Sequence, residues 1–202
     1  TIEISMADFT ASGFDASTVK KIVFFPAWGD QQGVIFQIDN MRFAPEPLVA
    51  DVFANELDSV WDIGVFSGGD HAVVTDVTLD DGNKVWELDF KADGGNTVII
   101  IESSTANDFS EFTSLQFDLR VLNYGANTSG FKLKLEGSGQ TPEMFAGQPD
   151  VDTWATIKIS MADFTASGFD ASTVKKIVFF PAWGDQQGVV FQVDNMKFIK
   201  EF

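Results

Sequence analysis

The chain has 202 residues and no cysteine, and its 13 Lys and Arg against 30 Asp and Glu give a formal net charge of −17. Such a charge repels polyanions and anionic lipid surfaces, which argues against nucleic-acid and membrane partners. The lack of cysteine excludes disulfides and thiolate metal sites, and the sequence contains no apolar run of about 18 residues that would span a membrane.

The chain contains a long internal repeat. Residues 156–198 repeat residues 1–43 and differ from them at Glu3/Lys158, Ile35/Val190, Ile38/Val193 and Arg42/Lys197. A repeating unit of this length suits a whole domain rather than a solenoid repeat. We therefore predict the C-terminal part of a preceding module over 1–43, a Pro-containing linker over 44–49 and a complete module over 50–202. Because the residues after the second copy differ from that linker, we expect this module to be the last one.

Apolar and polar residues alternate along most of the chain, which is typical of β-strands. Short polar turns, such as 80–83 and 92–96, contain Gly and Asn and favour hairpins. Short helical turns are expected only within 105–112 and 162–174. The pattern predicts an all-β, antiparallel two-sheet β-sandwich. Its ten expected strands are 50–54, 61–66, 72–79, 84–91, 96–102, 114–122, 131–136, 154–161, 175–182 and 188–198.

Residues 1–43 are expected to form copies of the last three of these strands, without the rest of a sandwich. Three strands with apolar faces bury little surface by themselves. Because this segment duplicates 156–198, it can take that place in another copy, which would give a strand-exchanged homo-oligomer. Dimerisation or a partner fragment that covers the segment are the alternatives.

The sequence gives little support for catalysis. The single histidine, His71, excludes a two-His metal centre and makes a Ser–His triad a poor interpretation. No dinucleotide-binding, phosphate-binding or HExxH motif occurs. Carboxylate pairs such as Glu136 with Glu143 or Asp118 stay open as glycosidase acids, but we expect the chain not to be an enzyme.

Six segments of the complete module carry a resemblance to a known family. They are DVFANELDSVWDIGVF, VWELDF, DFSEFTSLQFDLRV, WATIKISMADF, DASTVKKIVFFP and GVVFQVDNMKF. Their order resembles the galactose-binding-like jelly rolls of carbohydrate-binding modules. More narrowly, the FP-x-WG and V-D-N motifs are similar to the C-terminal module of marine bacterial exo-β-glucanases.

The resemblance implies a β-jelly roll that binds polysaccharide, in particular a β-glucan, as a tandem module of a secreted glycoside hydrolase from a marine bacterium. It also implies a structural Ca²⁺ between the first and last strands, with Asp194 as the matching ligand and Asp51 or Asp76 as further donors. Two other functions remain open. The chain could be a repeated spacer of an extracellular adhesin, or a domain that stabilises or dimerises its parent enzyme.

Two groups of residues are candidates for holding a sugar. The first is the turn that carries Trp183, Asp185, Gln186 and Gln187, where an indole can stack on a pyranose while the polar groups reach hydroxyls. Trp28, Gln31 and Gln32 repeat this set in the first copy. The alternative is a turn tryptophan folded onto the rim of the sandwich.

The second group is a polar strand face with Arg120, Lys132, Lys134 and Glu136. These side chains alternate with apolar ones, so we expect them on one outer sheet surface. The alternative is a solvated face without a ligand. Trp154 and Trp86 are expected in the core.

Overall fold

The computed structural model describes residues 22–26, 32–35, 37–38, 47–66 and 71–201. The chain divides into two compact units, Thr1–Phe43 and Ala44–Phe202, and each is treated separately. In the described part of the chain, no helix has the length and apolar character needed to cross a membrane.

The second unit is built from strands, as the alternation predicts. A one-turn helix and a 3₁₀ turn lie between β10 and β11, largely within the segment expected to hold a helical turn. β6 runs on to Asn107, so it includes residues for which a helical turn was expected. The elements are β1 (Leu48–Ala54), β2 (Glu56–Leu57), β3 (Trp61–Val65), β4 (Ala72–Thr78), β5 (Lys84–Phe90), β6 (Ile99–Asn107), β7 (Ser114–Asn123), β8 (Phe131–Glu136), β9 (Met144–Phe145), β10 (Trp154–Ser160), α2 (Met161–Thr165), η2 (Ala171–Thr173), β11 (Val174–Pro181) and β12 (Val190–Lys200).

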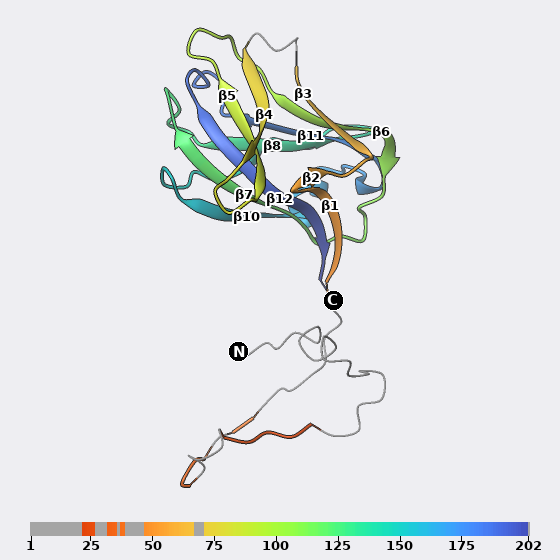
Figure 1. The fold of residues 1–202 in the computed structure, drawn as a ribbon. Helices are drawn as coiled ribbons and strands as arrows, with labels where there is room; N and C mark the ends of the chain where they lie inside the picture. The colour runs from red at the N-terminus through yellow and green to blue at the C-terminus, as the bar shows by residue number, and fades with distance from the viewer. Residues whose placement is uncertain (1–21, 27–31, 36, 39–46, 67–70, 202) are drawn as a thin grey trace. The chain divides into compact units, whose positions relative to one another are not determined.

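The strands form two antiparallel sheets. Sheet A has seven strands in the order β10-β7-β12-β1-β2, with β5 also paired to β12 and β4 to β5. Sheet B has five strands in the order β3-β6-β11-β8-β9. The first and last strands lie side by side, with Leu48 opposite Lys200 (Figure 1). This confirms the predicted two-sheet sandwich. β1 begins at Leu48, so the last residues of the predicted linker belong to the first strand.

The core lies between the two sheets, and phenylalanine supplies most of its largest fully buried side chains. Phe117 of sheet A meets Phe179 of sheet B with ring centroids 5.3 Å apart, and Phe191 meets Phe131 at 4.7 Å. Phe can fill such a core because it has no polar atom that needs a hydrogen-bond partner. The abundance of Phe in the sequence therefore reflects the core.

Alternation decides which side chains face outward. In β7, every second residue from Leu115 to Val121 is buried, whereas Gln116, Asp118 and Arg120 are partly exposed on the other side. Successive side chains of a strand point to opposite faces of its sheet, so these three residues lie on the outer face of sheet A.

Trp154 departs from the expectation of a core residue. It opens the edge strand β10 and pairs with outward-facing Arg120, and it is 37% exposed. Residues paired across two strands lie on the same face, which puts the indole on the outer surface of sheet A. Trp86, in contrast, is buried against Phe53 as expected, with ring centroids 4.0 Å apart.

Local hydrogen bonds hold the turns around this framework. Asp170 caps η2 by accepting from the Ser172 amide, and hydrogen bonds from Ser172 lower the pKa of the Asp170 carboxyl. The hydroxyl of Tyr124 donates to the carbonyl of Pro149, and burial followed by the nearby Asp150 carboxylate raises its pKa. Both interactions fix segments at the ends of strands.

Candidate functional site

The structure separates the predicted polar strand face into two parts. Arg120 lies on β7 in sheet A, whereas Lys132, Lys134 and Glu136 lie on β8 in sheet B. The outer faces of two stacked sheets point in opposite directions. The expectation that all four share one surface is therefore wrong.

Members of both predicted groups instead lie on the outer face of sheet B. They are Trp183 from the turn and Lys132, Lys134 and Glu136 from β8.

A row of residues crosses this face of sheet B. It is formed by Gly64, Ile100, Val178 and Lys134, which are paired in register. The space above Gly64 is open to solvent, since a Cβ built there would meet no atom within 4 Å. Val178 is buried within this row, so the low floor that reaches solvent is formed mainly by Gly64 and Ile100 and ends at Lys134.

A charged row runs beside that floor. Asp62, Glu102, Lys176 and Glu136 are paired across β3, β6, β11 and β8. Lys176 forms an ion pair with Glu102 at 3.0 Å. Lys176 and Glu102 are thus paired with each other, and all four side chains are at least partly exposed, so the row presents hydrogen-bonding groups to solvent.

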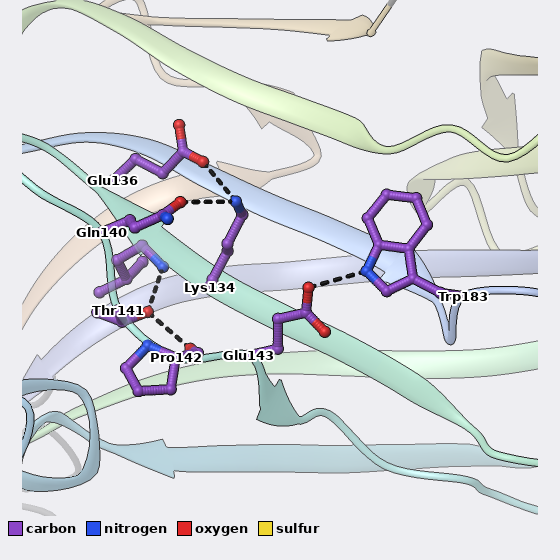
Figure 2. A network of polar contacts seen from close by, with 8 residues as sticks. Lys134, Glu136, Gln140, Thr141, Pro142, Glu143 and Trp183 are labelled. Carbon is purple, nitrogen blue, oxygen red and sulfur yellow. Dashed lines mark hydrogen bonds and ion pairs between the residues drawn. The ribbon is translucent and has the colours of Figure 1, made fainter.

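Trp183 lies next to this floor, in the turn after β11. Its ring packs on buried Phe180 with centroids 4.7 Å apart, and its Nε1 donates to Glu143 Oε1 at 2.8 Å (Figure 2). The indole is nevertheless 49% exposed. It is therefore a fixed aromatic surface, one part of which packs on the sandwich while the rest faces solvent, so it is available as a platform although the alternative of a turn residue folded onto the rim stays open.

Lys134 is held in place by two acceptors from the same part of sheet B. Its Nζ lies 2.7 Å from Glu136 Oε1 and donates to Gln140 Oε1 at 3.0 Å (Figure 2). Thr141 accepts from the Leu135 amide at 3.0 Å, which fixes the segment that leads to Glu143. The cation, the carboxylates and the indole are thus positioned before any ligand arrives.

Phe145 adds a second exposed ring beside this group. It lies on β9 opposite Lys132, whose Nζ is 5.8 Å from the ring centroid, and it is 57% exposed. This geometry is a cation–π contact. Sequence reasoning missed Phe145, because a strand of two residues is too short to show a period. It also did not connect Glu143 with Trp183, because their hydrogen bond joins residues 40 positions apart in the chain.

The other residues of the predicted turn have structural roles. Gln186 is 1% exposed, its Oε1 accepts from the Thr97 amide at 2.7 Å, and its Nε2 donates to the Pro181 carbonyl at 2.8 Å. Its hydrogen-bonding atoms are thus already used, and we leave it out of the candidate site. Asp185 is half-buried and accepts from the Thr128 hydroxyl at 3.5 Å.

Gln187 is directed toward the end of the sandwich, where its Nε2 donates to the Gly94 carbonyl at 3.4 Å. The backbone at Gly125 approaches this segment so closely that only glycine fits there. A Cβ added to Gly125, whose φ is +52°, would lie 2.2 Å from the Gln187 carbonyl oxygen. In the first copy, Gln32 is exposed, and Trp28 and Gln31 lie outside the described residues. Trp183 is therefore the member of its predicted group that joins the site on sheet B.

We define the sheet B site as Trp183, Glu143, Phe145, Lys132, Lys134, Glu136 and Gln140. Comparisons with known proteins bear on the fold that carries it. No family model matches the sequence, and no curated protein matches it either.

Solved structures, in contrast, show clear similarity. A family 11 carbohydrate-binding module from the cellulase Lic26A-Cel5E of Clostridium thermocellum matches with a TM-score of 0.54 and 17% identity, over 75% of this chain and 94% of that one. A family 30 carbohydrate-binding module matches with a TM-score of 0.57 and 17% identity, over 77% of this chain and 89% of that one. The chain has the fold of carbohydrate-binding modules.

The same fold occurs within larger enzymes. An exo-1,3/1,4-β-glucanase from a Pseudoalteromonas species matches with a TM-score of 0.55 and 10% identity, over 83% of this chain and 22% of that one. The carbohydrate-binding-module fold confirms the jelly roll expected from the sequence.

The carbohydrate-binding-module fold also raises the question of calcium. Asp194 is buried, and its oxygens accept from Asn83 Nδ2 at 2.7 Å and from the Asn195 amide at 2.7 Å. Asp51 and Asp76 are exposed on β1 and β4. Among the described residues, no group of three His, Cys, Asp or Glu side chains is placed to hold a metal. Ca²⁺ with Asp194, Asp51 or Asp76 as donors therefore stays a prediction of the resemblance.

Proposed function

We propose that the module binds a polysaccharide without catalysis, at the sheet B site. The observation that carries the proposal is Trp183, an exposed indole fixed between Phe180 and Glu143 beside a floor of low side chains. A pyranose presents a C–H face that packs on such a ring, and hydroxyls that pair with lysine and carboxylate groups. The fixed positions of Lys134 and Glu136 reduce the entropy lost when a sugar is bound.

The proposed ligand is a β-glucan. A family 11 module with this fold was solved in complex with a β-1,3-1,4-mixed-linked tetrasaccharide, and the exo-glucanase with this fold acts on 1,3/1,4-β-glucan by its name. A neutral glucan also suits a chain with a formal net charge of −17, which repels acidic polysaccharides. In this proposal the module is a secreted, non-catalytic part of a glycoside hydrolase.

Affinity electrophoresis of the full chain tests this proposal. Native gels containing laminarin, lichenan, agarose, alginate or a soluble cellulose derivative are compared with a gel without polysaccharide. We expect retardation by laminarin or lichenan and none by alginate. Lys134→Ala is expected to weaken retardation, whereas Lys158→Ala, which removes the same charge from β10 of sheet A, leaves it unchanged. Equal retardation of both variants and the parent would refute the sheet B site.

The internal repeat supports a second candidate function. Near-identical modules in series raise the avidity for a polymer through effective concentration, without improving either site. The same repetition suits the rigid spacer of an extracellular adhesin. If none of the five polysaccharides retards the chain, the spacer becomes the better interpretation.

We also propose that residues 1–43 pair with another copy of the chain. The described residues Ile22, Val23, Phe24 and Phe25 are 41–59% exposed, whereas their counterparts at 177–180 are at most 2% exposed in β11. Apolar surface of this kind favours association. Light scattering of the full chain at rising concentration is expected to show species larger than a monomer. A monomer at every concentration would contradict strand exchange.

A further inference from the structure

The outer face of sheet A, on the other side of the sandwich, carries its own row of aromatic and polar side chains. Trp154 of β10 pairs with Arg120 of β7, Arg120 with Gln192 of β12, and Gln192 with Glu87 of β5. This row shares no residue with the sheet B site. It combines an exposed indole with a cation, an amide and a carboxylate.

The neighbouring row of the same face is saturated with hydrogen bonds. Thr156 donates to Asp118 Oδ1 at 2.6 Å, and Asn195 Nδ2 donates to Asp118 Oδ2 at 2.9 Å. Asp194 accepts from Asn83 and Asn195. This network fixes the backbone beside the Trp154 row and has few positions left for a ligand.

The Trp154 row, in contrast, has two buried atoms with no hydrogen-bond partner among the described residues. They are Arg120 Nε and Gln192 Oε1, and Gln192 is 4% exposed. Buried polar atoms are paired in most proteins, because an unpaired one keeps its full desolvation cost. The donor and the acceptor belong to residues paired across β7 and β12, so one small group that enters between these two side chains would satisfy both atoms.

The orientation of both side chains supports such a partner. Gln192 Nε2 donates to Glu87 Oε2 on β5 at 2.9 Å, and Gln192 is paired on its other side with Arg120 of β7. Arg120 in turn uses Nη2 for Asp152 at 3.2 Å and leaves Nε open. The group that fits between them must accept from Nε and donate to Oε1.

A hydroxyl does both, because it has one donated hydrogen and two acceptor lone pairs. Next to Arg120, the surface is hollowed between this residue and the β4–β5 turn, which contributes Thr78, Leu79, Asp80 and Asp81. The two exposed carboxylates of this turn disfavour an anionic ligand, and Arg120 disfavours a cation. The chemistry that remains is a neutral compound with several hydroxyls, whose apolar face packs on Trp154.

We propose that the Trp154–Arg120–Gln192–Glu87 row is a second saccharide-binding site, on the sheet opposite the sheet B site. The ligand class rests on the proposed function, whereas the residues are independent of it. A module with sites on both outer faces would bind two polysaccharide chains, or two segments of one chain, at once.

Calorimetric titration of the full chain with laminarihexaose and with a mixed-linkage glucan hexasaccharide tests the proposal. The parent is expected to bind two oligosaccharides. Trp154→Ala is expected to weaken binding at the sheet A site by at least about tenfold. Trp183→Ala is expected to weaken the sheet B site instead. The exposed position of Trp154 allows the substitution without loss of the fold, which the unfolding temperature checks.

The outcomes separate the two proposals. One site that depends on Trp183 and is indifferent to Trp154→Ala overturns the second site and leaves the proposed function standing. Binding that depends on Trp154 and is indifferent to Trp183→Ala supports the second site and refutes the sheet B site. Arg120→Lys, which keeps the charge and removes Nε, is expected to weaken the Trp154 site. If its affinity is unchanged, an ordered water rather than a sugar hydroxyl fills the position, and the proposal fails.

Discussion

Trp183→Ala is expected to weaken glucan binding at the sheet B site by about tenfold or more. The substitution removes the half-exposed ring on which a pyranose would pack, and it leaves Glu143 without its indole donor. Calorimetric titration with laminarihexaose and affinity electrophoresis in laminarin both measure the effect. Trp183→Phe is expected to keep part of the affinity, since it retains an aromatic face and loses only the bond to Glu143.

Controls separate the loss of a binding surface from a loss of stability. Val49→Ala shortens a similarly exposed apolar side chain on β1, away from sheet B, and is expected to bind as the parent does. The unfolding free energy of Val49→Ala should agree with that of the parent within about 0.5 kcal/mol, because exposed substitutions rarely cost more. Trp183→Ala also uncovers Phe180, so its unfolding free energy is measured to confirm that the variant stays folded under the binding conditions. Unchanged affinity in Trp183→Ala would show that the indole is not the platform.

The fold could be predicted from the sequence because strand alternation is a local property. The buried positions of β7 and the outward position of Arg120 both follow from the period of two. Trp154 could have been placed outward by the same rule, since it alternates in phase with Thr156 and Lys158. The expectation of a core tryptophan came from the resemblance of this Trp-led strand to the family, and the position in the period was the better guide.

The composition of the site could not be predicted in the same way. The alternation of side chains along a strand determines which face of its own sheet each side chain occupies. It does not determine which of the two sheets the strand joins. Arg120 and Lys134 therefore seemed to share a surface, although pairing places them on opposite sides of the sandwich. Glu143 and Phe145 join the site through tertiary contacts with Trp183 and Lys132. Such contacts leave no local signal in the sequence.

Phe191→Ala is expected to cost the second unit about 3–5 kcal/mol of unfolding free energy, because it empties a large buried volume. Phe191 lies fully buried in β12 of sheet A and contacts rings from both layers of the sandwich. Its ring centroid is 4.7 Å from that of Phe131 and 5.4 Å from that of Phe179 in sheet B, and 6.0 Å from that of Phe90 in sheet A. Unfolding in urea, followed by tryptophan fluorescence, measures the loss.

The repeat provides a matched control for this prediction. Phe36 occupies the position in the first copy that corresponds to Phe191, in an almost identical sequence. If residues 156–198 alone complete the module, Phe36→Ala leaves the unfolding midpoint of the second unit unchanged. If the two copies exchange places, Phe191→Ala lowers the unfolding free energy by less than about 3–5 kcal/mol, because the first copy replaces the strand that carries the substitution. The double variant then shows the full loss, and the difference between double and single variants measures how far one copy substitutes for the other.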